Sequence, residues 1–189
     1  MQTVLQWLCF ARDDVTLSEI TDVLAVTFSD GPKFDLDERY PDPRDILTRC
    51  SSLVSVTTTW NREVLRLAHF SVKEYLVSSR IHASRASMYA VTETSANEII
   101  AQTCLAYISQ FKTVQCPDES TIRDYPLAEY ASRHWLEHVR LLKDAISDDL
   151  RALIVELFES SDTQRVRCFA LENPSAHSLT TGFSTHPNS

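Results

Sequence analysis

Glycine is nearly absent from this chain, with two residues among 189. Walker A loops and G-x-G-x-x-G turns need glycines a few positions apart, because only a bare backbone approaches nucleotide phosphates closely enough. Gly31 and Gly182 are too far apart to form either motif. We therefore expect that the chain does not bind a nucleotide by itself in this way, and we expect no cofactor.

Positive charge and long apolar runs are also scarce. The chain has 18 Lys and Arg against 26 Asp and Glu, which gives a net charge of -8 and a pI near 5.2. Such a charge repels polyanions such as DNA and anionic membranes. No apolar run approaches the roughly 20 residues that span a bilayer, and the N-terminus lacks the features of a signal peptide. We expect a cytoplasmic protein without membrane contact.

The cysteines have no pattern that indicates disulfides, a metal site or catalysis. The five of them are odd in number and never form a C-x-x-C pair. This usage suits a reducing compartment. None lies in a recognisable nucleophile motif, and Ser71 is expected to be occupied as an N-cap, so we expect no enzymatic activity. They are Cys9, Cys50, Cys104, Cys116 and Cys168.

The first 80 residues predict three short helices and a β-hairpin. Apolar spacing indicates helices at Val4–Ala11 and after a capping box of Thr16 and Glu19. A third helix is predicted behind Asp42 as N-cap and Pro43 as first helical residue.

Two alternating strands follow the third helix. Val54–Trp60 and Glu63–Ala68 predict a hairpin, whereas Ser29–Tyr40 reads as a loop. Helices followed by a hairpin wing match the winged-helix plan. We assign a winged-helix domain to residues 1–80 of a mainly α protein.

The second half of the chain predicts helices without strands. Capping boxes or caps are expected at Ser95 with Glu98 and at Asp148, and Pro126 is expected to open a further helix. The end of the chain is rich in Ser, Thr, Asn and Pro, a composition typical of disorder. We expect a connector over 81–93, a small helical domain over 94–160 and a disordered tail over 161–189.

His69 is the residue at which a functional site is most to be expected. The segment Leu65–Leu76, LRLAHFSVKEYL, reads as a strand followed by a helix, with Ser71 and Glu74 as capping box. His69 lies at this junction, where the fold holds it rigidly. Its spacing alone is also compatible with a histidine that serves only the strand end.

Two further interpretations start from other motifs. His134–His138, HWLEH, matches the H-x-x-E-H pattern of inverted zinc peptidases, with Glu137 as base. The pattern is short, a third ligand is not evident, and Trp135 and Tyr130 favour a packing surface, so we assign no metal. A metallohydrolase site formed by His134, Glu137 and His138 remains a minor alternative.

The second alternative is a DNA-binding winged helix. The third helix offers two cations and two anions on its polar face, where phosphate binding normally needs a basic cluster. This balance argues against nucleic acid as a partner. The residues are Asp42, Arg44, Asp45, Thr48 and Arg49.

Five motifs in order resemble the region that follows the NACHT ATPase in fungal NOD-like receptors. This region is often labelled the GPI inositol-deacylase-like winged-helix domain, and ankyrin repeats commonly follow it. The resemblance spans about Leu5–Leu142 and does not imply lipase activity. The motifs are LQWLCFA at Leu5, TLSEITDVLAV at Thr16, PDPRDILTRCSSLVSV at Pro41, LAHFSVKEYL at Leu67 and PLAEYASRHWLEH at Pro126.

The resemblance also implies a role for His69. In the wider STAND class of signalling ATPases, a winged-helix histidine in a His-x-Ser-x-x-Glu-Tyr motif contacts the β-phosphate of bound ADP. Here His69, Ser71, Glu74 and Tyr75 match that motif. The P-loop, the Mg-binding motif and the sensor arginine are absent from this chain, so His69 would contact ADP only with an ATPase domain present.

The sequence therefore predicts a non-catalytic regulatory or interaction module. It would be a fragment or relic of a NACHT-type receptor, with the NACHT ATPase domain and ankyrin repeats as partners in full-length relatives.

Overall fold

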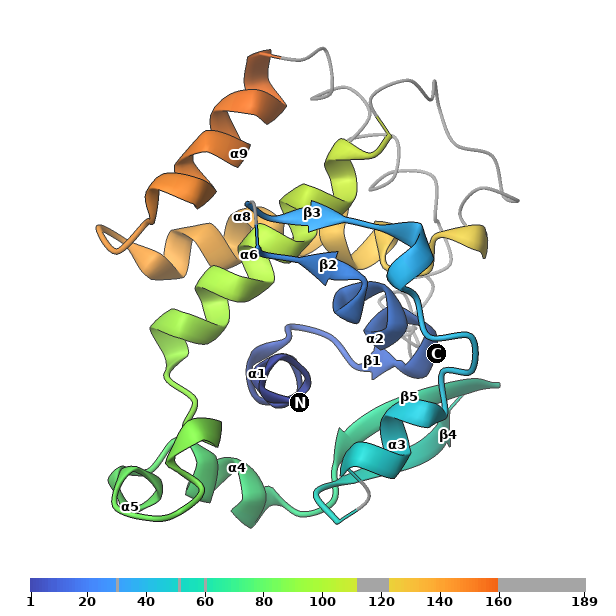
Figure 1. The fold of residues 1–189 in the computed structure, drawn as a ribbon, viewed down its shortest axis with the longest axis vertical. Coiled ribbons are helices and arrows are strands. Elements are labelled where there is room, and N and C mark those ends of the chain that lie inside the picture. The colour runs from blue at the N-terminus through green and yellow to red at the C-terminus, as the bar shows by residue number, and fades with distance from the viewer. Residues whose placement is uncertain (30, 51, 60, 112–122, 160–189) are drawn as a thin grey trace, which may run out of the picture.

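The computed structural model describes residues 1–29, 31–50, 52–59, 61–111 and 123–159 (Figure 1). The predicted tail over 161–189 lies outside these ranges. The described part is mainly helical, as expected. Its α-helices are α1 (Gln2–Phe10), α2 (Leu17–Leu24), α3 (Asp45–Cys50), α4 (Phe70–Leu76), α5 (Ser79–His82), α6 (Glu93–Ser109), α8 (Ala128–Leu142) and α9 (Asp148–Glu159), with 3-10 turns η1 (Leu36–Glu38) and η2 (Ser87–Tyr89).

The predicted hairpin supplies two strands of a three-stranded antiparallel sheet. Strands β4 (Val54–Thr59) and β5 (Arg62–Leu67) pair with Val56 opposite Leu65, and Asn61 in the turn adopts a φ of 63°. A short strand β1 (Val15–Thr16) pairs with β5 and gives the order β1-β5-β4. Three helices, a strand between the first two and a terminal hairpin are the winged-helix arrangement.

A second, smaller hairpin reaches into the segment Ser29–Tyr40, which was predicted to be a loop. Strands β2 (Val26–Thr27) and β3 (Lys33–Phe34) pair antiparallel, so Lys33–Phe34 is extended and not irregular. Each strand has two residues, which is too short for alternation to show in the sequence. Phe34 is buried edge-on against Tyr107 of α6, and this contact holds the hairpin on the helical half.

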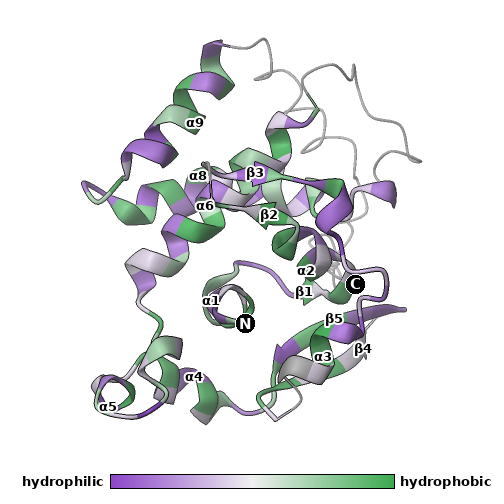
Figure 2. Ribbon diagram, viewed as in Figure 1, coloured by the Kyte–Doolittle hydropathy of each residue, from purple (hydrophilic) through white to green (hydrophobic). Residues whose placement is uncertain are grey.

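One hydrophobic core joins the two halves of the chain. Helix α6 lies between α1, α8 and α9, and its buried Ile100 and Cys104 belong to the same cluster as Trp7 and Ile20. Figure 2 shows α6 hydrophobic along much of the length that these elements surround. Residues before and after the expected connector over 81–93 are thus buried in the same hydrophobic core.

The expected connector itself contains ordered structure. It holds part of α5 and all of η2, and its buried Ile81 and Val91 form a second cluster with residues of α1, α4 and α6. The other members of this cluster are Leu5, Cys9, Leu76 and Ala96.

The predicted helix starts are partly wrong. Thr16 and Glu19 form the expected capping box, with Thr16 N–H donating to Glu19 Oε2 at 2.6 Å and Glu19 N–H donating to Thr16 Oγ1 at 3.2 Å. Elsewhere the capping residue precedes the predicted one. Thr92, not Ser95, caps α6, and Ser147, not Asp148, accepts the N–H of Leu150 in α9.

Two other starts are displaced towards the C-terminus. The side chain of Asp42 accepts the N–H of Arg44 in a turn that precedes α3, which begins at Asp45 and not at Pro43. Helix α8 begins at Ala128, two residues after Pro126.

A buried ion pair joins α2 to the segments that pack on it. Asp22 is 1% exposed, and Arg39 Nε lies 2.6 Å from its Oδ1. The hydroxyl of Tyr107 and the backbone N–H of Leu127 both donate to Oδ2. Burial raises the pKa of Asp22, an effect that the Tyr107 hydrogen bond and the Arg39 charge oppose.

Arg39 is held over two aromatic rings. Its guanidinium lies 5.5 Å from the ring centre of Phe34 and 5.4 Å from that of Tyr125, and it donates to the carbonyl of Asp124 at 2.9 Å. The planar guanidinium thereby places its positive charge beside Asp22 and also packs on apolar surface.

Replacing Arg39 by methionine should lower the free energy of unfolding by about 3 to 5 kcal/mol, because the Asp22 carboxylate stays buried without its cation. Urea denaturation at pH 7 measures this. The matched control is Arg44→Met, which breaks the exposed Arg44–Glu63 pair and should cost less than about 1 kcal/mol. Equal losses from both variants would contradict the role assigned to Asp22.

Candidate functional site

His69 caps helix α4 with its own side chain. The residue follows β5 in extended conformation, and its Nδ1 accepts the N–H of Ser71 at 3.2 Å. Ser71 Oγ lies 2.7 Å from the same nitrogen. The predicted capping box of Ser71 and Glu74 is therefore wrong: the cap is two residues earlier, and Ser71 lies in the first helical turn.

This arrangement assigns the protons of the His69 ring. Because Nδ1 accepts a backbone N–H, the neutral imidazole carries its proton on Nε2. His69 is exposed, and Nε2 has no hydrogen-bond partner among the residues that the structure describes. The side chain thus presents one fixed donor to solvent, a group that suits an anionic oxygen.

An exposed aromatic ring accompanies this donor. Phe70 is 70% exposed, and its ring centre lies 4.3 Å from that of His69 with the planes tilted by 39°. The sequence analysis did not single out Phe70. Apolar spacing cannot distinguish an exposed aromatic residue at a helix start from one that packs inward.

The structure brings only part of the matched motif together. His69 and Ser71 are in contact, whereas the Tyr75 hydroxyl donates to Ser84 Oγ at 3.0 Å, next to α5. Glu74 is exposed and makes no hydrogen bond or ion pair within the described ranges. His69 and Ser71 are therefore the two residues of the motif that lie in direct contact.

The HWLEH motif of α8 is divided between two environments. His138 is fully buried, with Nε2 2.9 Å from the Tyr130 hydroxyl and Nδ1 2.7 Å from Asn97 Oδ1. Asn97 Oδ1 can only accept, so His138 carries its proton on Nδ1, and the Tyr130 hydroxyl, which accepts the N–H of Arg12 at 3.0 Å, donates to Nε2. His138 Nδ1–H then donates to Asn97, and all these groups are satisfied.

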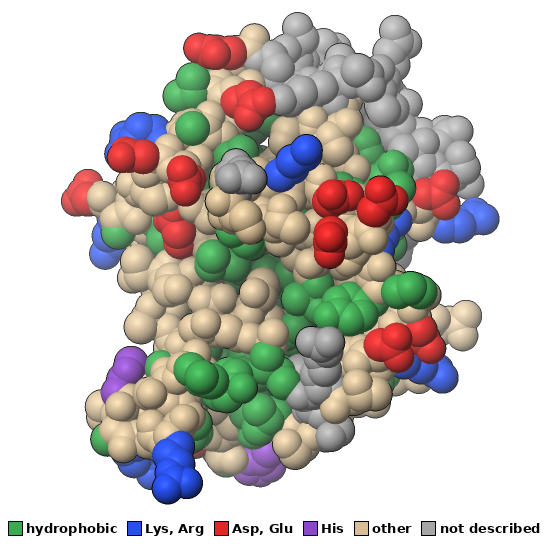
Figure 3. All heavy atoms as spheres, in the orientation of Figure 1, with side chains coloured by type: hydrophobic (Ala, Val, Ile, Leu, Met, Phe, Trp, Pro, Cys, Tyr) green, Lys and Arg blue, Asp and Glu red, His purple; other side chains and the backbone are tan. Residues whose placement is uncertain are grey.

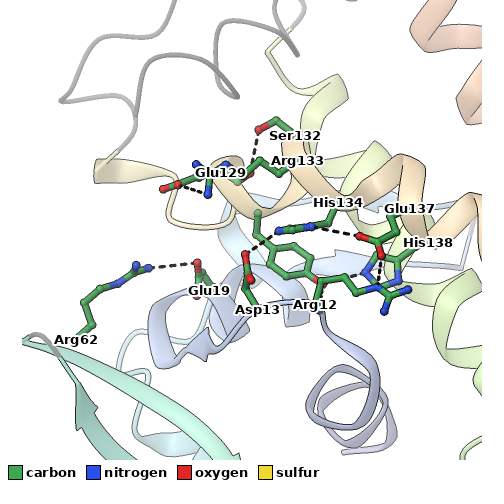
Figure 4. A network of polar contacts seen from close by, with 11 residues as sticks. Arg12, Asp13, Glu19, Arg62, Glu129, Ser132, Arg133, His134, Glu137 and His138 are labelled. Atoms are coloured by element: carbon green, nitrogen blue, oxygen red, sulfur yellow. Dashed lines mark hydrogen bonds and ion pairs between the residues drawn. The ribbon is translucent and has the colours of Figure 1, made fainter. Parts of the chain in front are cut away.

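The other residues of the motif face an ion-pair network near the surface. His134 Nε2 lies 2.8 Å from Asp13 Oδ2, and Glu137 Oε1 lies 3.0 Å from Arg12 Nε (Figure 4). A zinc site needs imidazole nitrogens that converge on one point, but both nitrogens of His138 are occupied inside the core. In the described ranges, three or more His, Cys, Asp or Glu residues never gather as metal ligands do.

The third helix does not present a free basic face in the part described. Arg44 Nη2 lies 2.6 Å from Glu63 Oε1 of the hairpin, and its neighbours Asp42 and Asp45 are acidic. The side chain of Arg49 lies outside the description. Phosphate binding would have to displace an existing carboxylate from Arg44.

Lowering the pH should destabilise the protein through His138. Burial lowers the pKa of this imidazole from 6.5 to about 4, and the charge of Arg12 adds to the effect. The unfolded chain therefore binds the proton first as the pH falls, so stability present above pH 6.5 is lost towards pH 4. We expect His138 alone to contribute a loss of about 2 kcal/mol between pH 7 and pH 5.

Urea unfolding at both pH values measures this loss in the unaltered chain and in His138→Gln. The variant should lose about 2 kcal/mol less over the same interval, whatever its stability at pH 7. A variant with the same pH dependence as the unaltered chain would show that His138 is not the titrating group.

Among the helices of the described ranges, none is both long and apolar enough to cross a bilayer. Comparison with known proteins shows a partial match to a longer protein. The chain is 33% identical over 140 residues to "Azaphilone pigments biosynthesis cluster protein L" from Monascus ruber, an alignment that covers 71% of this chain and 30% of the relative. The chain thus spans less than a third of the relative's length. No solved structure matches.

The N-terminal half has a clearer relationship. Its order of helix, strand, helix, helix and hairpin is that of a winged helix, and the sheet order β1-β5-β4 agrees. Residues 1–92 match the family model described as "GPI inositol-deacylase, winged helix domain", so this half of the chain is of that winged-helix type.

Proposed function

We propose that the chain is a non-catalytic regulatory module whose winged helix docks on a NACHT-type ATPase domain and contacts its bound ADP. The observation that carries this proposal is the exposed Nε2 donor of His69, set by the capping of α4. An N–H of this kind forms a charge-assisted hydrogen bond with a phosphate oxygen. The winged-helix match over residues 1–92 supports the family context.

In this function the residues of the chain bind and orient, and they transfer no group. His69 would donate to the β-phosphate of ADP while Ser71 keeps the ring in place. ADP bridges the two domains only in the closed arrangement, and ATP weakens that bridge, so nucleotide exchange shifts the population between two states.

The remaining parts of the proposal follow from the resemblance. The chain is a fragment or relic of a fungal STAND receptor, works in the cytoplasm, and in longer relatives stands before ankyrin repeats. A large interface with an ATPase domain is compatible with the exposed apolar residues of α4, among them Phe70.

The free chain should show no measurable binding of ADP by titration calorimetry, because one histidine supplies too little of a nucleotide site. A NACHT domain from a fungal receptor with the same winged-helix motif, added in trans, should bind the chain more tightly when loaded with ADP than with a non-hydrolysable ATP analogue. Biolayer interferometry measures both affinities.

Replacing His69 by alanine should weaken binding to the ADP-loaded domain by about tenfold, the usual effect of losing one charged hydrogen bond. His82→Ala is the matched control, since His82 is an exposed histidine on the neighbouring helix α5. Tight binding of ADP by the free chain, or equal affinities for the two variants, would overturn the proposal.

A further inference from the structure

Strand β4 is the outermost strand of the three-stranded sheet and has one open edge. In the order β1-β5-β4, β5 is its only strand neighbour within the described ranges. Figure 1 shows the hairpin of β4 and β5 at the margin of the molecule. The open edge of such a strand offers a row of backbone N–H and C=O groups to another strand.

The register of the hairpin determines which residues of β4 direct these groups outward. In an antiparallel pair, opposite residues that exchange backbone hydrogen bonds alternate with opposite residues that do not. The N–H of Ala68 donates at 2.9 Å to the carbonyl of Leu53, which lies opposite it one position beyond the paired strands. Every second residue from Leu53 onward therefore bonds to β5. The N–H and C=O groups of Val54, Val56 and Thr58 point away from β5.

The half of this edge nearer the hairpin turn is accessible. Val54 is 6% exposed at the start of β4, whereas Val56 is partly exposed and Thr58 is exposed. In the part of the chain that the structure describes, the outward backbone groups of Val56 and Thr58 have no hydrogen-bond partner. Backbone groups in this position bond to water or to a further strand.

The side chains of β4 favour pairing and lack the usual protections against it. Its sequence, VSVTTT, has no charge, proline or glycine, and valine and threonine are enriched in strands. Natural edge strands are commonly protected by lysine, proline, a bulge or a very short length. The strands β1, β2 and β3 are short, with two residues each. Among the described strands, β4 thus has the edge that suits a further strand.

We propose that β4 of one copy pairs antiparallel with β4 of a second copy across a two-fold axis at Thr57. In this register Val56 of each copy lies opposite Thr58 of the other, and the two residues exchange backbone hydrogen bonds. The accessible outward groups of both copies are then satisfied. An axis at Val56 would instead use the buried Val54. This association goes beyond the proposed function and needs neither nucleotide nor ATPase domain.

A second copy fits this edge because the strand is complementary to itself. The register places threonine opposite threonine or valine, and serine opposite threonine, which are favourable cross-strand neighbours. The charged residues of β5 beside the edge are already paired, Glu63 with Arg44 and Arg66 with Asp14.

The two-fold arrangement also ends at two copies. Pairing through β4 leaves β1 at each end of the joined sheet, and β1 is too short to accept a further strand. The contact uses the same surface on both copies, so it forms a closed dimer and not a filament.

Opposite charges at Thr57 test the pairing and its register. This residue is exposed, so a charged side chain there is compatible with the fold of the monomer. Thr57→Lys and Thr57→Glu each place like charges face to face at the axis, and each should weaken the dimer by about tenfold. An equimolar mixture of the two variants should restore it, because lysine then lies opposite glutamate.

Sedimentation velocity over a range of chain concentrations measures these associations. The unaltered full chain should form a dimer and no larger species, and more readily at high salt, which screens the charge of -8 on each copy. Thr27→Lys is the matched control, since it adds the same charge at an exposed threonine of β2 and should dimerise like Thr27→Glu and the unaltered chain. Circular dichroism verifies that all variants fold.

Amide hydrogen exchange followed by NMR tests the alternation along the strand. The amides of Val56 and Thr58 should exchange more slowly at high chain concentration than at low concentration. The amide of Thr57 bonds to β5 in the monomer, so it should be protected equally at both.

The proposal is overturned if the unaltered chain stays monomeric at every concentration, a result that would leave the edge to a strand of another protein. It is also overturned if the Thr57 variants associate as the unaltered chain does, or if their mixture does not restore the dimer. Growth beyond two copies that both variants abolish would contradict the two-fold pairing and indicate open-ended stacking of strands.

Discussion

The buried Asp22–Arg39–Tyr107 cluster is the constraint on which the arrangement of the chain depends. Its members come from α2, from the segment after β3 and from α6, and the carboxylate also accepts the backbone N–H of Leu127 ahead of α8. A charge so deep in the core is tolerated only when an opposite charge and hydrogen-bond donors lie beside it. The cluster therefore specifies how the winged helix meets the helical half, since a small displacement would leave a buried charge unsatisfied.

The two histidine sites show how differently one residue type is used. At His69 a backbone N–H fixes the ring from one side and the other nitrogen remains in solvent. At His138 both nitrogens lie in a chain of hydrogen bonds that runs from Arg12 through Tyr130 to Asn97. The first arrangement leaves a donor for another molecule, and the second uses the whole ring to join α8 to α6.

Local sequence signals predicted the hairpin and the capping box of Thr16, because both depend on neighbours a few residues apart. The same signals misplaced the caps of α4, α6 and α9. Ser71, Ser95 and Asp148 have the chemistry of capping residues, yet the chain turns into the helix one to three positions earlier. The choice among several candidate caps is made by the packing of the helix, which local spacing does not encode.

The features of the candidate site that depend on distant residues could not be predicted. HWLEH has the spacing of metal ligands, and only the presence of Asn97 and Asp13, 41 and 121 positions away, separates its two histidines. Similarly, the second hydrophobic cluster beside α4 exists because a segment that is polar in composition folds back on Leu76. The motif that contains His69 can be recognised in the sequence. Which ring nitrogen carries the proton cannot, because that depends on the backbone conformation at the end of β5.

The shared core extends beyond the segment that matches the winged-helix family. The winged-helix match ends at residue 92, just before α6, yet Trp7 of α1 packs against Tyr130 of α8 with ring centres 4.9 Å apart. A protein cut at that boundary would expose the inner face of its first helix to water. In this chain the segment that matches the winged-helix family is thus shorter than the segment that shares one core, and α6 and α8 supply the cover for Trp7.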